Sequence, residues 1–361
     1  MQGKGSLVTG MIVPGPLNAL TDVAGIAVGH AEHSTRPTGT TVVLCAEPMI
    51  AAAEIGGGAP GTRAVSILDQ GRVASHVDAI ALSGGSAFGL DAAGGAMDRL
   101  RQARRGFAMG RARVPIVPGA IIFDLMTGMS ADAPTDWDTP PWFRLGHEAA
   151  DAALSALSAG AAPIAMGNAG AGMGARAGGI KGGLGTSSLV HEAGGRRVSV
   201  AALTVANPVG RVVVPGSRAF WAAPYERGEE FGGVPWPGLP LLPEDLDFPF
   251  EAFSVGTNTT LAVVATDLAL DQSQCARVAA MARDGFARAI RPVHSPLDGD
   301  SIFVMATGRV PVRDPVADTG RAGMMAADCV ARSIARGVHA AAALPGLPAW
   351  RDLGEDGLPG S

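Results

Sequence analysis

Cysteine is scarce in this 361-residue sequence, and long apolar segments do not occur in it. The three cysteines, Cys45, Cys275 and Cys329, lie far apart and form no Cys-x-x-Cys pair, which excludes a disulfide framework and predicts small buried side chains in a reducing compartment. No run reaches the roughly 18 uninterrupted apolar residues of a membrane-spanning helix, and the N-terminus lacks the charged-then-apolar pattern of a signal peptide. We therefore expect a cytoplasmic protein with no membrane partner.

Charged residues are also few, at 17% against 47% hydrophobic residues, and the formal net charge is −5. This composition provides a large core and excludes disorder as a global state. Basic residues gather only around Arg99 to Arg105, which we interpret as the solvated end of a helix. Nucleic acid is therefore not an expected partner.

Glycine, in contrast, is abundant, with 51 residues, many of them between short apolar runs. This pattern favours tight strand connections over a coiled coil or a helical solenoid. Strand patterns alternate with long amphipathic helix patterns, as expected for an α/β fold in which helices cover sheets. The strands are predicted within 16–30, 38–44, 77–82, 114–125, 198–205, 261–265 and from 302, and the helices up to 100 and within 147–157, 273–290 and 326–338.

The composition changes between Pro215 and Phe250, where proline, glycine and acidic residues dominate. We expect a linker at about 215–254 within one structural domain. The first six residues are expected to be an expression remnant or a disordered start, and they are left out of the fold reasoning.

Two histidines and a carboxylate lie close together at His30, Glu32 and His33, which raises the question of a metal site. They lie where a predicted strand runs into a loop, and no third ligand of a suitable kind follows nearby. We expect no metal.

Gly84-Gly85-Ser86 follows a predicted strand and precedes a helix, as a serine-hydrolase nucleophile would. The Gly-x-Ser-x-Gly frame fails because Phe88 occupies its last position. We favour close packing of the helix on the strand, with Ser86 available as an N-cap.

The most glycine-dense stretch, 167–185, contains Lys181 and raises the question of phosphate binding. A P-loop needs Gly directly before the lysine and Ser or Thr directly after it, whereas Ile180 and Gly182 stand there. No nucleotide and no other cofactor is expected. A lysine buried among glycines loses solvation, which lowers its pKa, and its ammonium can orient a reacting group.

The stretch from Gly256 to Asp267 combines a turn, two hydroxyls and an apolar run. The run from Leu261 to Ala265 predicts a strand covered on both faces. Thr259 precedes this strand, and a threonine hydroxyl becomes a nucleophile when a peptide cut in front of it frees its own α-amine to act as base. The alternative is a turn whose hydroxyls cap a core strand.

Several segments together resemble one family, the N-terminal-nucleophile hydrolases that include D-aminopeptidases, β-peptidyl aminopeptidases and nylon-oligomer hydrolases. The resemblance runs from about Asn18 to the last predicted helix and is closest to the nylon-oligomer branch. The segments that carry it are Asn18–His30, Thr38–Val43, Gly170–Met173 leading to Lys181, Asn207–Gly210, Thr257–Thr260 and Asp298–Phe303.

The resemblance implies a layered αββα sandwich whose chain cuts itself between Asn258 and Thr259. The products are an α chain, 7–258 without the N-terminal remnant, and a β chain, 259–361, which stay associated. Relatives assemble from such heterodimers, so a homo-oligomer, a tetramer of heterodimers, is expected.

The resemblance also assigns the catalytic residues. Thr259 is the nucleophile, Lys181 and Asn207 surround it, and Asp298 and Asp300 complete the site. The Asn207 amide can donate a hydrogen bond to a developing oxyanion. One carboxylate can orient the threonine amine while the other holds Lys181. Turn formation is the alternative role for the Asp-Gly-Asp segment.

The substrate pocket is expected to involve Gly85, Ser86 and Phe123. Some members carry a tyrosine where 122–124 stands here, so this chain lacks that phenol hydroxyl. The expected function is an amide hydrolase acting on 6-aminohexanoate (nylon) oligomers or short peptides. The alternatives are a β-peptidyl or D-amino-acid aminopeptidase, an acyltransferase of the ornithine acetyltransferase type, and an uncleaved small-molecule binding protein.

Overall fold

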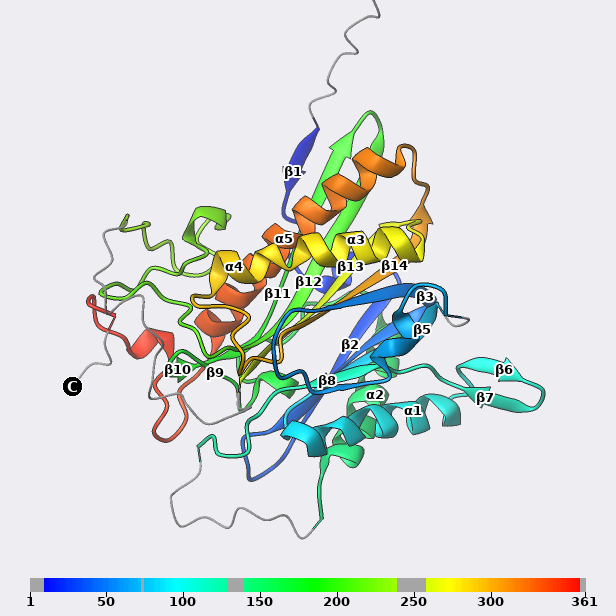
Figure 1. Cartoon of the computed structure of the whole chain (residues 1–361), viewed down its shortest axis with the longest axis horizontal. Coiled ribbons are helices and arrows are strands. Elements are labelled where there is room, and N and C mark those ends of the chain that lie inside the picture. The colour runs from blue at the N-terminus through cyan, green and yellow to red at the C-terminus, as the bar shows by residue number, and fades with distance from the viewer. Residues whose placement is uncertain (1–9, 73–74, 129–138, 239–257, 358–361) are drawn as a thin grey trace, which may run out of the picture.

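The computed structural model describes residues 10–72, 75–128, 139–238 and 258–357 of the chain (Figure 1). In these residues one large mixed sheet has the strand order β1-β11-β12-β13-β14-β3-β5-β8-β4, and β2 pairs with β3. Its strands are β1 Met11–Val13, β2 Ile26–Glu32, β3 Gly39–Ile55, β4 Thr62–Arg63, β5 His76–Ser83, β8 Gly119–Ile121, β11 Gly183–Ala193, β12 Arg196–Asn207, β13 Thr259–Leu268 and β14 Ser301–Val310.

Two short hairpins and five α-helices complete the described fold. The hairpin of β6 and β7 projects from the body of the molecule (Figure 1) and is exposed along both strands. None of the described helices is long and apolar enough to cross a membrane. The hairpins are β6 Phe107–Met109 with β7 Ala112–Val114 and β9 Arg176–Ala177 with β10 Ile180–Lys181, and the helices are α1 Asp91–Gln102, α2 Trp142–Ala159, α3 Gln272–Ala282, α4 Asp284–Ala289 and α5 Pro315–Ala340.

Strand β13 is buried on both faces, as its apolar run predicts. Side chains that alternate along a strand point to opposite faces. Leu261, Val263 and Ala265 join one core cluster, which also contains residues of β3 and β5. Ala262 and Val264 join another cluster, which they share with α3 and α5. Strand β13 therefore lies between two cores.

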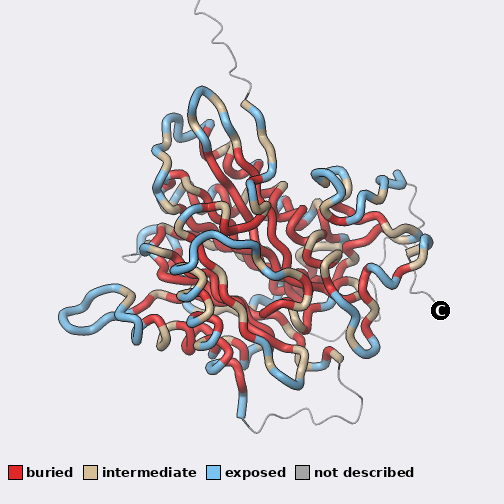
Figure 2. Tube along the Cα trace, turned by 180° about the vertical axis from the view of Figure 1, so that it is seen from behind, coloured by how far each residue is buried: buried red, intermediate tan, exposed pale blue. Residues whose placement is uncertain are grey.

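The half of the sheet that contains β3 is also buried on both faces. Val43 and Cys45 of β3 face the core between the two halves of the sheet. Their neighbours Val42 and Leu44 face a third core, formed with α1 and α2. Helices α3 to α5 and helices α1 and α2 thus cover opposite sides of the folded sheet, whose interior is buried (Figure 2). The predicted α/β layered sandwich is confirmed, and the three cysteines are free and buried as expected.

Two predicted elements are shorter than their sequence patterns suggest. Within the strand expected over 114–125, only Val114, the end of β7, and Gly119–Ile121, strand β8, lie in strands, because Pro115 and Pro118 have no N–H to donate to a ladder. The helix expected over 273–290 is divided into α3 and α4 at Arg283. Immediately beyond the break, Gly285 packs so closely on α5 that a Cβ there would lie 2.4 Å from the Ala327 carbonyl oxygen.

The expected linker does not behave uniformly. Residues 215–238 pack on the body of the protein, where Phe220 and Phe231 are buried in the same core as α5. The remainder of the expected linker, 239–254, lies outside the described residues, as do the first six residues.

Candidate active site

The predicted nucleophile, Thr259, lies at the ends of three neighbouring strands in the middle of the sheet. Strands β13 and β14 run parallel, so their N-terminal ends share an edge, and antiparallel β12 ends at the same place. Asn207, the last residue of β12, pairs with Thr259, the first residue of β13. Asn258 forms a bridge with Asp298, just before β14. This topology brings Asn207 and Asp298, which lie far apart in the sequence, into one buried group.

The Thr259 side chain is directed at the peptide bond in front of it. Its Oγ1 donates a hydrogen bond to the carbonyl oxygen of Asn258 at 2.5 Å. The same oxygen accepts the N–H of Gly299 at 3.0 Å. Thr259 is 4% exposed, so the hydroxyl and this carbonyl are shielded from bulk water. A backbone donor on the carbonyl is the arrangement that stabilises an oxyanion, and the sequence motif gave no reason to assign that role to Gly299.

The two predicted carboxylates accept backbone N–H groups from the loops around Thr259. Asp300 accepts the N–H of Thr260 at 2.7 Å, and Asp298 accepts the N–H of Val209 at 3.1 Å and that of Ser295 at 2.9 Å. Burial, followed by repulsion from Asp300, raises the pKa of Asp298. These carboxylates therefore fix the position of Thr259 through its neighbours.

His294 belongs to this group and was missed by the sequence reasoning. Its Nδ1 lies 2.7 Å from the second oxygen of Asp300, and its backbone N–H donates to that oxygen at 3.3 Å. The residue has a left-handed backbone with φ of +53°, a conformation that costs energy for a residue with a side chain. In the sequence, His294 stands six residues before Asp300, and this spacing alone does not indicate that the two side chains are in contact.

Asn207 is fully buried, and its side-chain amide contacts two backbone groups; its donation to an oxyanion stays a prediction. Its Oδ1 accepts the N–H of Arg176 at 2.8 Å, and its Nδ2 faces the Phe123 carbonyl oxygen at 3.5 Å. The amide is thus fixed at the end of β12 beside Thr259, with its donor side turned toward the chain that follows β8.

Lys181 is fully buried, as the glycine-rich surroundings predict. Its Nζ donates to the carbonyl oxygens of Gly172 at 2.8 Å and Gly182 at 2.9 Å. Desolvation lowers its pKa to about 7, against the opposing attraction of Asp124. The expectation that Asp298 or Asp300 holds this lysine is wrong, because neither carboxylate forms an ion pair with it among the described residues.

Asp124 is the acidic partner that the sequence reasoning did not identify. It is buried, and it accepts the N–H of Gly85 at 2.7 Å. Burial raises the pKa of Asp124 to about 7. The Thr38 hydroxyl, the Gly85 N–H and Lys181 act in the opposite direction, but their effect is smaller than that of burial. Its Oδ2 has no hydrogen-bond partner in the described part of the chain. A buried lysine and a buried carboxylate, each with its pKa moved toward neutrality, therefore lie on one side of the site.

The three predicted substrate-binding residues lie beside this pair. Gly85 has φ of +91° and Ser86 has φ of +51°, and the Ser86 N–H donates to the Ile122 carbonyl oxygen. The expected N-cap function of Ser86 is wrong, because Leu90 is the N-cap of α1 and no side chain caps that helix. Both residues and Phe123 thus border Asp124 through their backbone, and their contact with a substrate stays a prediction.

The residues considered for a metal site have other partners. Nδ1 of His30 lies 3.0 Å from the Thr41 hydroxyl, and burial lowers the pKa of this histidine to about 4. Glu32 accepts the N–H of Gly170, and Nδ1 of His33 accepts backbone N–H groups of the following turn. The Glu32 and His33 side chains therefore fix loops, and His30 contacts its partner across the β2–β3 ladder.

A family model and several known proteins are similar to this chain. The model of peptidase family S58 matches residues 18–349. A protein of Mycobacterium tuberculosis named as an uncharacterized aminopeptidase is 40% identical over 356 residues, covering 93% of this chain and 98% of its own length. A 6-aminohexanoate-oligomer endohydrolase of Paenarthrobacter ureafaciens is 29% identical over 294 residues, covering 80% of this chain and 75% of its own.

Solved structures show the same fold. A β-aminopeptidase of a Burkholderia species has a TM-score of 0.63 and 24% identity, with 93% of this chain and 91% of that chain covered. The L-aminopeptidase D-Ala-esterase/amidase of Ochrobactrum anthropi, described as a variant of the Ntn-hydrolase fold, has a TM-score of 0.61 and 22% identity, with 91% and 88% covered. With the family model matching most of its length, the chain belongs to peptidase family S58 and is a hydrolase of peptide or amide bonds.

Proposed function

We propose that this hydrolase activates itself by cutting the peptide bond between Asn258 and Thr259. The observation that carries the proposal is the 2.5 Å hydrogen bond from the Thr259 hydroxyl to the Asn258 carbonyl oxygen, together with the Gly299 N–H on the same oxygen. The nucleophile lies next to its own target bond, and a donor is already in place for the charge that develops on the oxygen.

The chemistry follows from these neighbours. Thr259 Oγ attacks the Asn258 carbonyl carbon, the C–N bond breaks, and the acyl group moves from nitrogen to oxygen as an ester. The hydroxyl proton ends on the freed α-amine. Water then hydrolyses the ester, leaving a carboxylate at Asn258 and both a hydroxyl and an α-amine on Thr259. In later turnovers this amine takes the Oγ proton as general base.

Mass spectrometry of the intact purified protein tests the cut. Cleavage predicts chains of 258 and 103 residues. Thr259→Val should remain full length, whereas Thr260→Val should still be cut, because the buried Thr260 hydroxyl has no partner among the described residues. A full-length wild-type chain, or a cut before Thr260, contradicts the proposal.

We further propose that the mature enzyme hydrolyses amide bonds of 6-aminohexanoate oligomers. Support comes from the relative named for that reaction and from the Asp-x-Asp pair shared with its branch. Such substrates bind mainly through methylenes, each contributing about 0.8 kcal/mol on burial, so a charged anchor is not required. Hydrolysis of free oligomers should therefore persist after N-acetylation.

An aminopeptidase is the second candidate, and two observations favour it. A 40% identical relative is named an aminopeptidase, and Asp124 provides a buried carboxylate able to hold a substrate ammonium. If N-acetylation of the oligomer or of a short peptide abolishes hydrolysis, the enzyme needs a free amine and this function replaces the first. Acyl transfer to an added amine acceptor would instead identify a transferase.

A tetramer of cleaved heterodimers remains part of the proposal. Sedimentation of the purified protein measures the mass of the assembly, and a monomeric result contradicts this part alone.

A further inference from the structure

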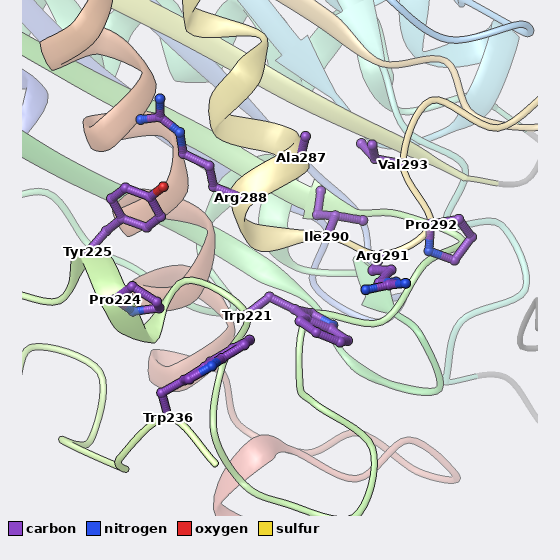
Figure 3. A pocket seen from close by; sticks show the side chains of 10 residues that line it. All are labelled: Trp221, Pro224, Tyr225, Trp236, Ala287, Arg288, Ile290, Arg291, Pro292 and Val293. Atoms are coloured by element: carbon purple, nitrogen blue, oxygen red, sulfur yellow. The ribbon is translucent and has the colours of Figure 1, made fainter. Parts of the chain in front are cut away.

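A pocket of about 660 Å³ lies between the end of α4 and the segment that follows β12 (Figure 3). One wall consists of residues 287–293, and the other comes from residues 221–236. The ten lining residues are Trp221, Pro224, Tyr225, Trp236, Ala287, Arg288, Ile290, Arg291, Pro292 and Val293. None of them belongs to the group around Thr259.

The charge of this pocket is positive and only partly compensated. None of the lining residues in the described part of the chain is acidic. Arg288 forms an ion pair with Asp328 at 2.5 Å and lies over the Tyr225 ring, 5.0 Å from its centre. Arg291 forms no ion pair within the described residues, and its guanidinium lies 5.4 Å from the centre of the Trp221 ring. One guanidinium therefore faces the pocket without a carboxylate.

A second pocket, of about 510 Å³, differs from the first in having acidic residues in its lining. It lies beside α1, where Arg63, Arg101 and Arg113 are accompanied by Asp91 and Asp98. Arg101 pairs with Asp98 at 2.7 Å. That pocket also has no cluster of aromatic side chains, since Phe143 is its single aromatic residue.

Besides its arginines, the first pocket has apolar walls that can contact the hydrocarbon part of a ligand. Trp221 and Trp236 lie with their ring centres 5.7 Å apart and tilted by 55°. Ile290, Pro292 and Val293 extend this surface on the opposite wall (Figure 3). Aromatic faces and aliphatic side chains bind flat or extended hydrocarbon, and an uncompensated guanidinium binds a carboxylate through two parallel hydrogen bonds.

We propose that this pocket is a binding site for an organic monocarboxylate with an aromatic or alkyl body. The carboxylate pairs with Arg291, and the body lies against Trp221 and Trp236. Such a group occurs both in free organic acids and at the C-terminus of a peptide with an apolar last residue. The proposal does not depend on the identity of the nucleophile.

The pocket is nevertheless connected to the catalytic side of the fold. Arg291 and Arg211 exchange backbone hydrogen bonds of 2.8 and 2.9 Å, four residues beyond Asn207. Val293, the last residue of that pocket wall, is followed directly in the chain by His294, the partner of Asp300. An occupant of the pocket therefore touches the segment that supports both loops of the active site.

Calorimetric titration of the full-length protein with 4-phenylbutyrate tests the proposal, and 4-phenyl-1-butanol is the uncharged counterpart. We expect saturable binding of the acid and at least fivefold weaker binding of the alcohol. Arg291→Gln should weaken the acid at least fivefold and leave the alcohol unchanged. Arg113→Gln, at an exposed arginine of the second pocket, is the matched control and should change neither affinity.

N-acetylphenylalanine, in a parallel titration, distinguishes the two sources. Tighter binding of this compound indicates a peptide C-terminus, and tighter binding of phenylbutyrate indicates a free acid, both in support of the site. Equal affinity for acid and alcohol, no effect of Arg291→Gln, or no saturation up to about 10 mM would overturn the proposal. Trp236→Leu, which removes an aromatic wall and keeps the charge, should also weaken the acid.

Discussion

Replacing Gly299 by alanine should slow self-cleavage sharply without unfolding the protein. A Cβ at this position would lie 2.6 Å from Thr259 Oγ1 and 2.8 Å from the Ala59 carbonyl oxygen, both closer than the 3.0 Å that real Cβ atoms keep. The Ala59 oxygen belongs to the backbone, so the threonine hydroxyl is the group that is able to move.

The size of the effect follows from that displacement. Restoring ordinary contact requires Oγ1 to move by roughly 0.5–1 Å, and a misplacement of about 1 Å in a reacting group typically costs about 10²-fold in rate. This corresponds to about 2.7 kcal/mol in activation free energy. We therefore expect Gly299→Ala to accumulate as a full-length chain under conditions in which the wild type is cut.

The assay follows the full-length band and the two fragments over time after synthesis, with circular dichroism to establish folding. Gly320→Ala is the matched control, because no atom lies within 4 Å of the Cβ that it adds on α5. It should be cut at the wild-type rate and be slightly more stable, by up to about 1 kcal/mol. A folded Gly299→Ala protein that is cut as fast as the wild type would refute the reasoning.

Three further predictions concern the surroundings of the site. His294→Asn should reduce the rate of turnover more than the affinity for substrate, because it removes the 2.7 Å contact that orients Asp300; a wild-type kcat measured with any cleaved amide contradicts this. Arg332→Met should lower the free energy of unfolding by about 3 kcal/mol in chemical denaturation, since it removes the partner of Glu230 at 2.6 Å and leaves that carboxylate with Arg336 at 3.6 Å and the Asn18 amide; a loss below about 1 kcal/mol contradicts it. Lys181 has a pKa of about 7 in the fold against an ordinary 10.5, so the unfolded chain binds the extra proton between these values. The stability that depends on this residue should accordingly rise from about pH 7 to about pH 10.5, and unfolding curves of Lys181→Met should lack that rise.

The sequence predicted the strands better than the contacts between them. The apolar run of β13 identified a doubly buried strand, because side-chain alternation and burial are local properties. The gathering of Asn207, Thr259 and Asp298 depends on the parallel pairing of β13 with β14, which no local pattern encodes, and it was expected only through the family resemblance. Asp124 and His294 were missed because their roles arise from tertiary contacts with residues distant in the chain or across a turn.

The position of β13 in the sheet has a consequence for how the molecule loses activity. Strands β13 and β14 form a pair that lies between β12 on one side and β3 on the other, and both of these strands belong to the part of the chain before Asn258. If the chain is cut before Thr259 as proposed, the smaller chain pairs with the larger one along two strand ladders, β12–β13 and β14–β3. Both ladders must open before the two chains can separate. Once separated, the two chains regain this arrangement only by meeting again in solution, so recovery after denaturation becomes a second-order process that depends on protein concentration. The uncut Thr259→Val chain keeps its halves tethered and should refold at a rate independent of dilution, so the proposed cleavage would make unfolding harder to reverse.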